Sequence, residues 1–408
     1  MDDYGADGRS ETAAGDVSAR EARPISLCVY TRMWQSGGTT LFAQELVDGL
    51  LDIGADVTFI APPGETEPDG RQRLRLTRMR PPREKMGGGS RLARAASSFA
   101  RVLAADYYLL KARFSTRLFI ITIPDPMLFV LPALLLLRLT AARIILVEHD
   151  PVPHAWRLPP RWRWFEKRSL GLRYRLSDLI VVLSDASRDK LSESYPRTRD
   201  IVRVCQHGVF PMGEPQPPPA AGRLLLFGTI RRNKGITEAM AGVIAARATG
   251  TPVKLLVAGA VHLEDPAYVQ DCRDLARTAP DIIEMRVGHV DDDMLPRILA
   301  GSDALLLPYK NFFSQSGVAI LAASNARPVI ASRAGGIATL LDEGMPAACI
   351  EGDVSAESVA SAIRDFFTVP ADEWYRRAMA YRDLILEQRS WQAIARNYVA
   401  LANGLSES

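Results

Sequence analysis

Short apolar runs alternate with amphipathic stretches along the first half of the chain. The segment 39–54 carries apolar residues at helical spacing and ends at Gly54, so it predicts a helix. The apolar runs predict buried strands at 25–31, 56–62, 117–125, 142–150 and the start of 178–195. Within the last of these, Ser184 or Asp185 predicts the N-cap of a helix. Strands and helices in this order are typical of a doubly wound parallel sheet.

The same alternation starts again after a segment rich in proline and glycine. This segment, Phe210–Gly222, predicts a linker between two domains. Beyond it, apolar runs predict strands at 223–228, 253–259, 283–290, 303–309 and 328–332. Helical patterns occur at 235–249, 266–279, 355–369 and 372–404. Two such α/β domains in tandem suit a site for two substrates, because ligands bind beyond the carboxyl ends of parallel strands.

Length and composition agree with two soluble domains. The chain has 408 residues, too many for one ordinary core, and 47% of them are hydrophobic. The four cysteines lack metal or disulfide spacing, which predicts reduced thiols in a cytosolic compartment. Residues 1–22 predict a disordered tail rather than a signal peptide. The longest apolar stretch, Met127–Thr140, contains Pro132 and Arg138 and falls short of the roughly 20 residues of a membrane span, so we expect a buried helix.

The net charge of +3 hides a strongly basic first half. Residues 71–117 are rich in arginine and lysine, and the segment 154–175 adds arginines among aromatic residues. A basic half suggests an anionic surface or ligand. The segment 154–175 predicts docking to an anionic membrane or to a lipid-linked diphosphate, whereas the alternative is an ordinary surface with aromatics packed inward. The residues expected to make this contact are Arg161, Trp162, Arg163 and Trp164. Nucleic acid is not expected as a partner, because no nucleic-acid module is recognisable.

A basic turn in the second half has the chemistry of a phosphate site. In "LLLFGTIRRNKGI" a strand ends at Gly228 and a helix starts near Gly235. Arg231, Arg232 and Lys234 lie on the turn between them, where cations can neutralise a diphosphate. A solvated turn that happens to be basic is the alternative.

A second candidate phosphate site is the start of the uncharged helix that follows "SQSGV". The N–H groups of Ser316, Gly317 and Val318 would be unpaired there, and the helix dipole favours an anion. Gly317 would let a ligand approach the backbone closely. An ordinary serine-capped helix is the alternative. The glycine turn at 335–336 favours the anion, because it would offer further backbone donors at the same sheet end.

Five motifs occur in the order and spacing of a known family: "FGTIRRNKGI", "KLLVAGA", "GHVDDDMLPRILAGSDALLLPY", "SQSGVAILAASNARPVIAS" and "AGGIATLLDEG". They resemble those of GT-B glycosyltransferases of the family-4-like type, and the resemblance covers about residues 25–400. It implies two Rossmann-like domains that face a cleft: an acceptor-binding domain at 23–209 and, after the linker 210–222, a nucleotide-sugar-binding domain at 223–385. The last helix, within 386–408, would cross back and pack on the first domain.

The resemblance also implies roles for individual residues. His149 matches the position where related enzymes place a histidine beside the transferred sugar, and Asp150 follows it. The donor phosphate would lie against Gly38 at the first strand-to-helix turn, as well as against the basic turn and the helix start described above. Nucleoside-binding residues would be Gly259, His289 and Val290. We expect no cofactor besides the donor nucleotide sugar, and no metal, because no residue spacing supports a metal site.

Several acid–base assignments stay open. Glu148, Asp150 and Asp125 are the nearest general-base candidates if the reaction inverts the anomeric configuration. For His149 the alternative is a buried, hydrogen-bonded histidine, and for His154 a structural role is equally open. His207 is interpreted as structural.

The sequence departs from the family pattern at three positions. Thr229 stands where the family commonly has arginine after the turn glycine, and Arg231 would take over that charge. The family commonly has two glutamates in the later stretch, one facing the donor sugar and one binding the ribose. Here these positions fall near Ser314 and near Leu321 or Ala322, and none of these residues is acidic.

The expected function is that of a cytosolic glycosyltransferase bound peripherally at the inner face of the cell membrane. It would transfer a hexose from a nucleoside diphosphate donor to a glycan acceptor, lipid-linked, in bacterial polysaccharide or exopolysaccharide synthesis, with retention of configuration favoured. One alternative is a catalytically degenerate GT-B protein that binds glycan or serves as a scaffold. Another is a GT-B sugar-nucleotide epimerase.

Overall fold

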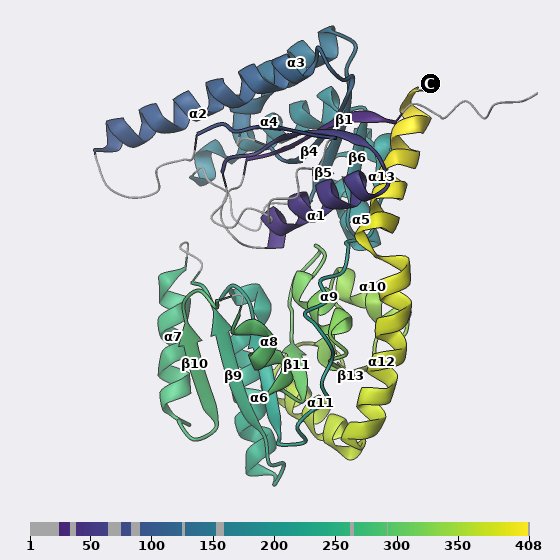
Figure 1. Ribbon diagram of the computed structural model, residues 1–408. Coiled ribbons are helices and arrows are strands. Elements are labelled where there is room, and N and C mark those ends of the chain that lie inside the picture. Colours follow the sequence, from purple (N-terminus) through teal and green to yellow (C-terminus); the bar gives the residue numbers. More distant parts are fainter. Residues whose placement is uncertain are drawn as a thin grey trace, which may run out of the picture.

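The computed structural model describes residues 24–32, 38–63, 75–82, 90–124, 127–151, 159–261, 265–291 and 293–406. It shows two α/β domains, one above the other in Figure 1, each with a parallel sheet. The predicted pair of Rossmann-like domains is thus confirmed. The predicted tail lies outside the described residues.

The sheet of the first domain has seven parallel strands in the order β3-β2-β1-β4-β5-β6-β7. Their bounds are β1 (Ser26–Thr31), β2 (Asp56–Ile60), β3 (Leu76–Met79), β4 (Leu118–Ile123), β5 (Arg143–Glu148), β6 (Leu179–Val182) and β7 (Val202–Val204). The central strands are buried on both faces, which is why they form continuous apolar runs in the sequence. The edge strands β3 and β7 are short and partly exposed, so the apolar pattern did not predict them.

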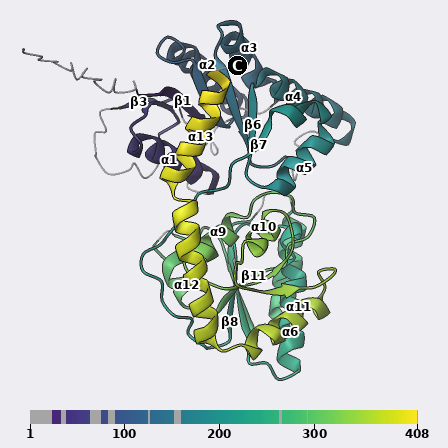
Figure 2. The same ribbon diagram turned by 90° about the vertical axis from the view of Figure 1, so that its right-hand side faces the viewer.

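Helices cover both faces of this sheet. One face packs against α1 (Gly38–Asp52) and α13 (Trp391–Ser406). The other packs against α2 (Arg91–Ala112), α3 (Leu131–Leu139), α4 (Arg163–Leu176) and α5 (Asp185–Ser194). Short 3-10 turns flank these helices: η1 (Met127–Val130), η2 (Pro160–Trp162) and η3 (Pro196–Ile201). In the views of Figures 1 and 2, α2 and α3 lie on the side of the first domain that is remote from the second domain.

The apolar stretch Met127–Thr140 forms η1 and α3, and α3 is buried on one side only. Its inner side holds Ala133, Leu134 and Leu137, and its outer side exposes Leu135, Leu136 and Leu139. The expectation of a buried helix is therefore correct for the inner face and wrong for the outer one. Within the described part of the chain, no helix is long and apolar enough to cross a membrane.

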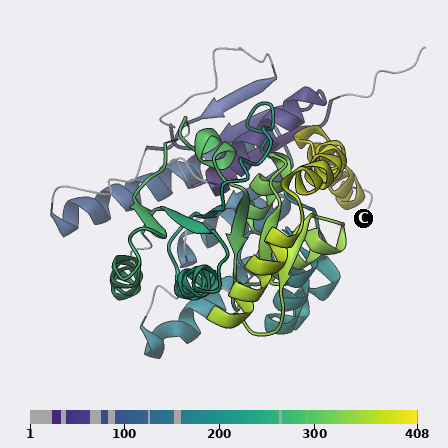
Figure 3. The same ribbon diagram turned by 90° about the horizontal axis from the view of Figure 1, so that it is seen from below.

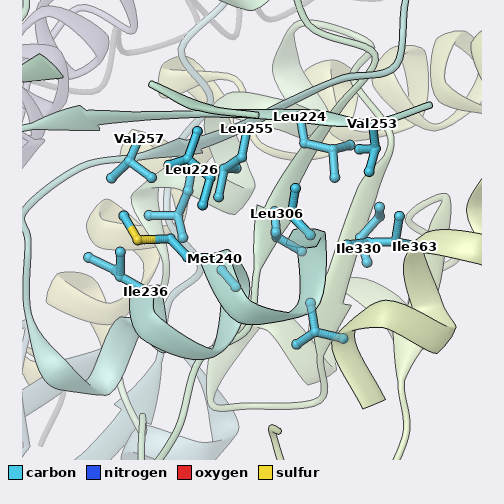
Figure 4. Close-up of a cluster of buried hydrophobic side chains, with 14 of the residues drawn as sticks. Leu224, Leu226, Ile236, Met240, Val253, Leu255, Val257, Leu306, Ile330 and Ile363 are labelled. Carbon is cyan, nitrogen blue, oxygen red and sulfur yellow. The ribbon is translucent and has the colours of Figure 1, made fainter. Parts of the chain in front are cut away.

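The second domain has a six-stranded parallel sheet in the order β10-β9-β8-β11-β12-β13. The strands are β8 (Arg223–Phe227), β9 (Lys254–Gly259), β10 (Ile283–Val287), β11 (Ala304–Leu307), β12 (Val329–Ser332) and β13 (Ala347–Ile350). The helical elements are η4 (Arg232–Lys234), α6 (Ile236–Ala248), α7 (Pro266–Arg277), α8 (Leu295–Ala300), α9 (Gly317–Ser324), α10 (Gly336–Asp342) and α11 (Ala356–Thr368). Figure 4 shows how Met240 and Ile236 of α6 pack under Leu226 and Val257 in this core.

The predicted linker is tied to the second domain by hydrogen bonds. The Phe210 N–H donates to Ser324 Oγ at 3.2 Å, and the Met212 N–H donates to Asn325 Oδ1 at 2.8 Å. The Tyr375 hydroxyl donates to the Pro215 carbonyl at 3.1 Å. The proline-rich segment therefore follows the surface of the second domain rather than hanging between the two.

The last helical run is two helices, not the single one that the pattern at 372–404 predicts. Figure 2 shows α12 (Ala371–Gln388) along the second domain, and α13 continuing from it onto the first. They break at Arg389, whose carbonyl accepts a hydrogen bond from the Val209 N–H at 3.1 Å. Ser390 then caps α13, because its Oγ accepts from the Ala393 N–H. The prediction that the last helix crosses back and packs on the first domain is confirmed.

Trp391 anchors this crossing helix. Its indole N–H donates to the Val209 carbonyl at 2.9 Å, and its ring meets the Phe42 ring edge-on at a centroid distance of 5.3 Å. A Cβ added at Gly49 of α1 would lie 2.3 Å from the Trp391 carbonyl oxygen. Glycine at position 49 thus lets α1 and α13 approach closely.

Candidate functional site

The carboxyl ends of β5 and β11, in different domains, meet at the domain boundary. The Ser314 hydroxyl donates to Asp150 Oδ1 at 2.6 Å, and the Ser187 hydroxyl donates to the Phe313 carbonyl at 2.9 Å. Asp150 follows β5 directly, and Ser314 lies in the loop between β11 and α9. The two positions that the sequence singled out in separate domains are therefore brought into contact.

His149 is the last residue before Asp150 and packs against an aromatic ring. Its ring meets Phe42 of α1 edge-on at 4.9 Å. Burial lowers the His149 pKa to about 4, although the nearby Asp150 carboxylate acts in the opposite direction. Its Nε2 atom is buried and has no hydrogen-bond partner among the described residues. The ring is thus neutral at pH 7 and keeps one nitrogen available, unlike the fully hydrogen-bonded histidine of the alternative interpretation.

Glu148, a general-base candidate from the sequence, is committed elsewhere. Its carboxylate forms an ion pair with Arg173 and accepts a hydrogen bond from the Tyr174 hydroxyl at 3.0 Å. Burial raises the Glu148 pKa, which Arg173 and Tyr174 oppose. These contacts attach α4 to β5, so the structure assigns Glu148 a structural role. Asp125 and His154 lie outside the described residues.

Lys234 lies in η4 and faces aromatic rings and the domain boundary. Its Nζ is 3.6 Å from the centroid of the Tyr309 ring and 5.1 Å from that of Phe312. Burial and the neighbouring Arg231 lower the Lys234 pKa to about 7, while Asp150 of the other domain raises it. A partly uncharged lysine beside an arginine is an environment that an anion would stabilise.

The two arginines of the basic turn have different surroundings. Arg231 has a buried Nε without a hydrogen-bond partner among the described residues. Arg232 instead forms an ion pair with Asp265, the N-cap of α7, at 2.5 Å and stacks over the Tyr268 ring at 4.7 Å. Lys234 and Arg231 therefore remain candidates for anion binding, and Arg232 fastens the turn to α7.

The start of α9 is open around Gly317. Ser316 is the N-cap, and its Oγ accepts from the Ala319 N–H at 3.2 Å. The N–H groups of Gly317 and Val318 remain at the helix start. A Cβ added at Gly317 would meet no atom within 4 Å, so the space beside this residue is open. A Cβ added at Gly228 would lie 3.4 Å from Val318 Cγ2, so Gly228 lies close to the start of α9.

The glycine turn before α10 has a different role from the one expected. The Gly336 N–H donates to the Ser314 carbonyl at 3.0 Å, so this donor is already used. Gly335 has φ +54°, and a Cβ there would lie 2.7 Å from the Ser314 carbonyl oxygen. These glycines support the loop that carries Ser314, and the expectation that Gly336 offers a free backbone donor is wrong.

The two positions where the family commonly has glutamate lie in different environments. Ser314 is buried and bonded to Asp150 at the domain boundary. Leu321 and Ala322 are buried in the core of the second domain, packed with residues such as Ile320. The α9 stretch therefore supplies no carboxylate to the site. The carboxylate next to Ser314 is that of Asp150, which belongs to the first domain.

The predicted nucleoside residues lie together at the carboxyl ends of β9 and β10. The Gly288 N–H donates to the Gly259 carbonyl at 3.0 Å, which joins the two strand ends. A Cβ at Gly259 would lie 1.9 Å from the Gly228 carbonyl oxygen, so only glycine fits at φ +155°. His289 is exposed and Val290 half-buried. Their role in binding the nucleoside stays a prediction.

The remaining predicted contacts lie at the start of α1 and around the start of α4. Gly38 is the first residue of α1, and the turn before it lies outside the described residues. Arg161, Trp162, Arg163 and Trp164 form η2 and the start of α4, and all four are exposed. Over the residues that the structure describes, no group of three or more His, Cys, Asp or Glu side chains is placed to hold a metal ion.

Three contacts of the site had no clear signal in the sequence. Phe42 supports His149, Tyr309 stacks under Lys234, and Ser187 joins the domains. His207, interpreted as structural, is buried among Phe42, Phe210 and Trp391, and burial lowers its pKa to about 4.

Two parallel-sheet domains that meet at their strand carboxyl ends, joined by a C-terminal helix that crosses back, define the GT-B class of glycosyltransferases. The chain belongs to its family-4-like group: residues 36–211 match the model of Glycosyltransferase Family 4, and residues 221–368 match that of Glycosyl transferases group 1.

Known proteins resemble this chain over different lengths. The glycogen synthase of Mycobacterium tuberculosis is 27% identical over 227 residues, 54% of this chain and 53% of the relative. The GDP-mannose:glycolipid 4-beta-D-mannosyltransferase of Xanthomonas campestris is 26% identical over 220 residues, 52% of this chain and 56% of the relative. The chain thus matches about half the length of these curated relatives. The Anabaena protein Alr3699/HepE, solved in complex with UDP and glucose, shares the fold with a TM-score of 0.68 at 14% identity, covering 94% of this chain and 100% of that one.

Proposed function

We propose that the protein transfers a sugar from a nucleoside diphosphate donor to a glycan acceptor. The observation that carries this proposal is the hydrogen bond between Asp150 of the first domain and Ser314 of the second. Lys234 lies close enough to Asp150 that this carboxylate raises the Lys234 pKa. Names among the relatives and neighbours support the donor class, since they include a GDP-mannose-dependent enzyme and a complex with UDP.

The departing diphosphate would lie against Lys234, Arg231 and the N–H groups of Gly317 and Val318. Its negative charge develops as the bond to the sugar breaks, and fixed cations and backbone donors stabilise such charge. The unpartnered Arg231 Nε and the open start of α9 support this arrangement.

His149 and Asp150 would lie beside the transferred sugar. A neutral imidazole with a free Nε2 can donate or accept a hydrogen bond from a sugar hydroxyl without a charge change. Asp150, with its Ser314 hydrogen bond, would supply the negative charge opposite a sugar that becomes electron-deficient. We also propose that the transferred sugar is a hexose and that the reaction retains its anomeric configuration.

We further propose a lipid-linked acceptor and a role in bacterial polysaccharide synthesis, at the inner face of the cell membrane. The exposed Arg161, Trp162, Arg163 and Trp164 support this location, because tryptophan and arginine favour a lipid headgroup region. The glycolipid in the name of the Xanthomonas campestris relative is consistent with such an acceptor.

A thermal-shift panel with UDP, GDP, dTDP, ADP and CMP tests the donor site. A nucleotide that binds only the folded protein raises the melting temperature, and Lys234→Ala should abolish that rise. Lys310→Ala is a matched control, since Lys310 is paired with Glu238 instead. If no nucleotide shifts the wild type, or if Lys234→Ala responds as the wild type does, the proposed diphosphate site is wrong.

Sugar transfer itself separates the enzyme from a glycan-binding scaffold. Donor consumption with a glycan acceptor should cease in His149→Ala while nucleotide binding persists. A wild-type protein that binds the nucleotide but never consumes the donor would favour the scaffold, and interconversion of sugar nucleotides without an acceptor would favour an epimerase.

A further inference from the structure

The outer surface of the first domain holds most of the exposed large apolar side chains that the structure describes. Most of these side chains lie on six neighbouring segments: α2, the turn after it, η1, α3, η2 and α4. Among the described residues, four exposed large apolar ones lie elsewhere: Leu41, Met294, Phe313 and Leu384. The members on these helices and turns are Leu92, Phe99, Leu103, Tyr107, Phe114, Phe129, Leu135, Leu136, Leu139, Trp162, Trp164 and Leu172. We name the exposed surface of α2, α3 and α4, with these flanking turns, the outer three-helix face.

Helix α2 is apolar on two opposite sides. Its inner side packs in the core through residues such as Ala105, Leu109 and Ala112. Its outer residues Leu92, Phe99, Leu103, Tyr107 and Phe114 recur at spacings of seven and four, so they form one stripe along the helix. Leu92 is 82% exposed and Phe114, just after the helix, 95%. A stripe of this size on a soluble surface marks an interaction site.

The outer three-helix face is also strongly basic, although one of its arginines, Arg138, is ion-paired with Asp178 just after α4. Its exposed charged residues are Arg94, Lys111, Arg117, Arg138, Arg161, Arg163, Lys167, Arg168 and Arg175. Among the described residues of 90–117, 127–140 and 159–176, the acids are Asp106, which is half-buried, and Glu166, which is buried. Apolar side chains, interfacial aromatics and arginines without exposed acids are the composition of a surface that binds anionic lipid.

We propose that the outer three-helix face docks flat on an anionic membrane, with the α2 stripe inserted at the level of the lipid headgroups. This extends the predicted contact at 161–164 to a surface centred on α2, and it rests on the proposal that the protein works at a membrane. A second copy of the chain fits less well, because a two-fold contact would place basic residues against basic residues. Nucleic acid fits less well, because it offers no apolar partner for the stripe.

The α4 end of the face lies on the side of the candidate functional site. Helix α4 follows β5, whose carboxyl end carries His149 and Asp150, so the amino end of α4 lies on the site's side of the sheet. Seen from below, α2 (blue) extends beyond the outline of the second domain, so that domain leaves it accessible (Figure 3). An acceptor anchored in the same membrane would therefore approach Asp150 across the start of α4.

Vesicle sedimentation tests this proposal. The full chain should sediment with vesicles of phosphatidylglycerol and phosphatidylcholine, and far less with phosphatidylcholine alone. The triple variant Phe99→Ser, Leu103→Ser, Tyr107→Ser should lose about 1,000-fold in affinity, because each of the three large side chains that no longer inserts costs about a factor of ten. The double variant Met294→Ser, Leu384→Ser removes exposed apolar side chains of the second domain and should bind as the wild type does.

The outcomes separate the two membrane proposals. Insertion of the α2 stripe is refuted if the triple variant binds vesicles as the wild type does, whatever the effect of replacing residues 161–164, because membrane binding then holds without the α2 side chains. Both proposals fail if the wild type ignores anionic vesicles. A wild-type dimer that the triple variant dissociates would assign the stripe to a second copy instead. The triple variant must keep its nucleotide-induced thermal shift, which shows that it is folded and leaves the sugar-transfer proposal untouched.

Discussion

Lys234 couples donor binding to a proton. The amine lies against the Tyr309 ring beside Arg231, and burial with that neighbour lowers its pKa from 10.5 to about 7. A diphosphate at the start of α9 would favour the charged ammonium and raise the pKa again. Below the lowered pKa the amine is already protonated in the free protein. Above it, each binding event must take up a proton from solution.

The size of the effect follows from the pH range between the lowered and the ordinary pKa of Lys234. Between the lowered and the ordinary pKa of Lys234, affinity should fall about tenfold for each pH unit, hence about 100-fold from about pH 7.5 to about pH 9.5. The terminal phosphate of a nucleoside diphosphate is already ionised there, since its second pKa is about 6. The phosphate of the nucleotide therefore does not contribute to the slope.

Isothermal titration calorimetry measures both quantities with the nucleotide that gives the largest thermal shift. Titrations near pH 8.5 in buffers of different ionisation enthalpy should show uptake of about one proton per nucleotide bound. Lys234→Met should abolish the uptake, and Lys310→Met should preserve it. A wild-type affinity that is flat over this range would refute the coupling and the placement of the diphosphate at Lys234.

Three further predictions concern the crossing helix and the catalytic pair. Trp391→Ala should lower the free energy of unfolding by about 3–5 kcal/mol, because it leaves a cavity beside α1 and removes the bond to Val209; denaturation followed by circular dichroism measures this, and a loss below about 1 kcal/mol would contradict the anchoring role. Asp150→Asn should lower kcat for transfer by about 100-fold or more, and Ser314→Ala, which removes only the hydrogen-bond donor, by much less; equal losses would argue against a role for the Asp150 charge. Donor consumption should stay flat with pH near 5–7 as far as His149 is concerned, because its lowered pKa keeps it neutral there; a step in kcat near pH 6.5 that His149→Gln removes would contradict this.

Much of the fold could be predicted from the sequence, because parallel strands that are buried on both faces consist of continuous apolar residues. The runs at 25–31 and 142–150 became β1 and β5, and the proline-rich segment marked the domain boundary. The edge strand β3 escaped because two of its four residues are exposed. The helical pattern at 372–404 did not show the break between α12 and α13, because the contact at the break joins Arg389 to Val209, which is far away in sequence. Only the family resemblance implied a separate last helix within 386–408.

The site was predictable as far as single segments carry chemistry. The turn with Lys234 and the helix start after Ser316 were identified from local patterns. The pairing of Asp150 with Ser314 could not be, because it needs the relative placement of two domains. The sequence also could not show that, among the described residues, Arg232 forms an ion pair while Arg231 does not. This difference depends on the position of Asp265, the N-cap of α7, beside Arg232.

The two connections between the domains lie side by side. The Val209 N–H bonds to the Arg389 carbonyl, and the Trp391 indole bonds back to the Val209 carbonyl. The Arg389 guanidinium is paired with Glu343 at the end of α10, which also accepts from Gln206 of the first domain. Because the two crossings are hydrogen-bonded to each other, they form one joint between the domains. We expect this joint to resist twisting of the domains about the long axis more than rotation that separates Asp150 from Ser314. The two halves of the site should therefore meet in the same register whenever the domains close.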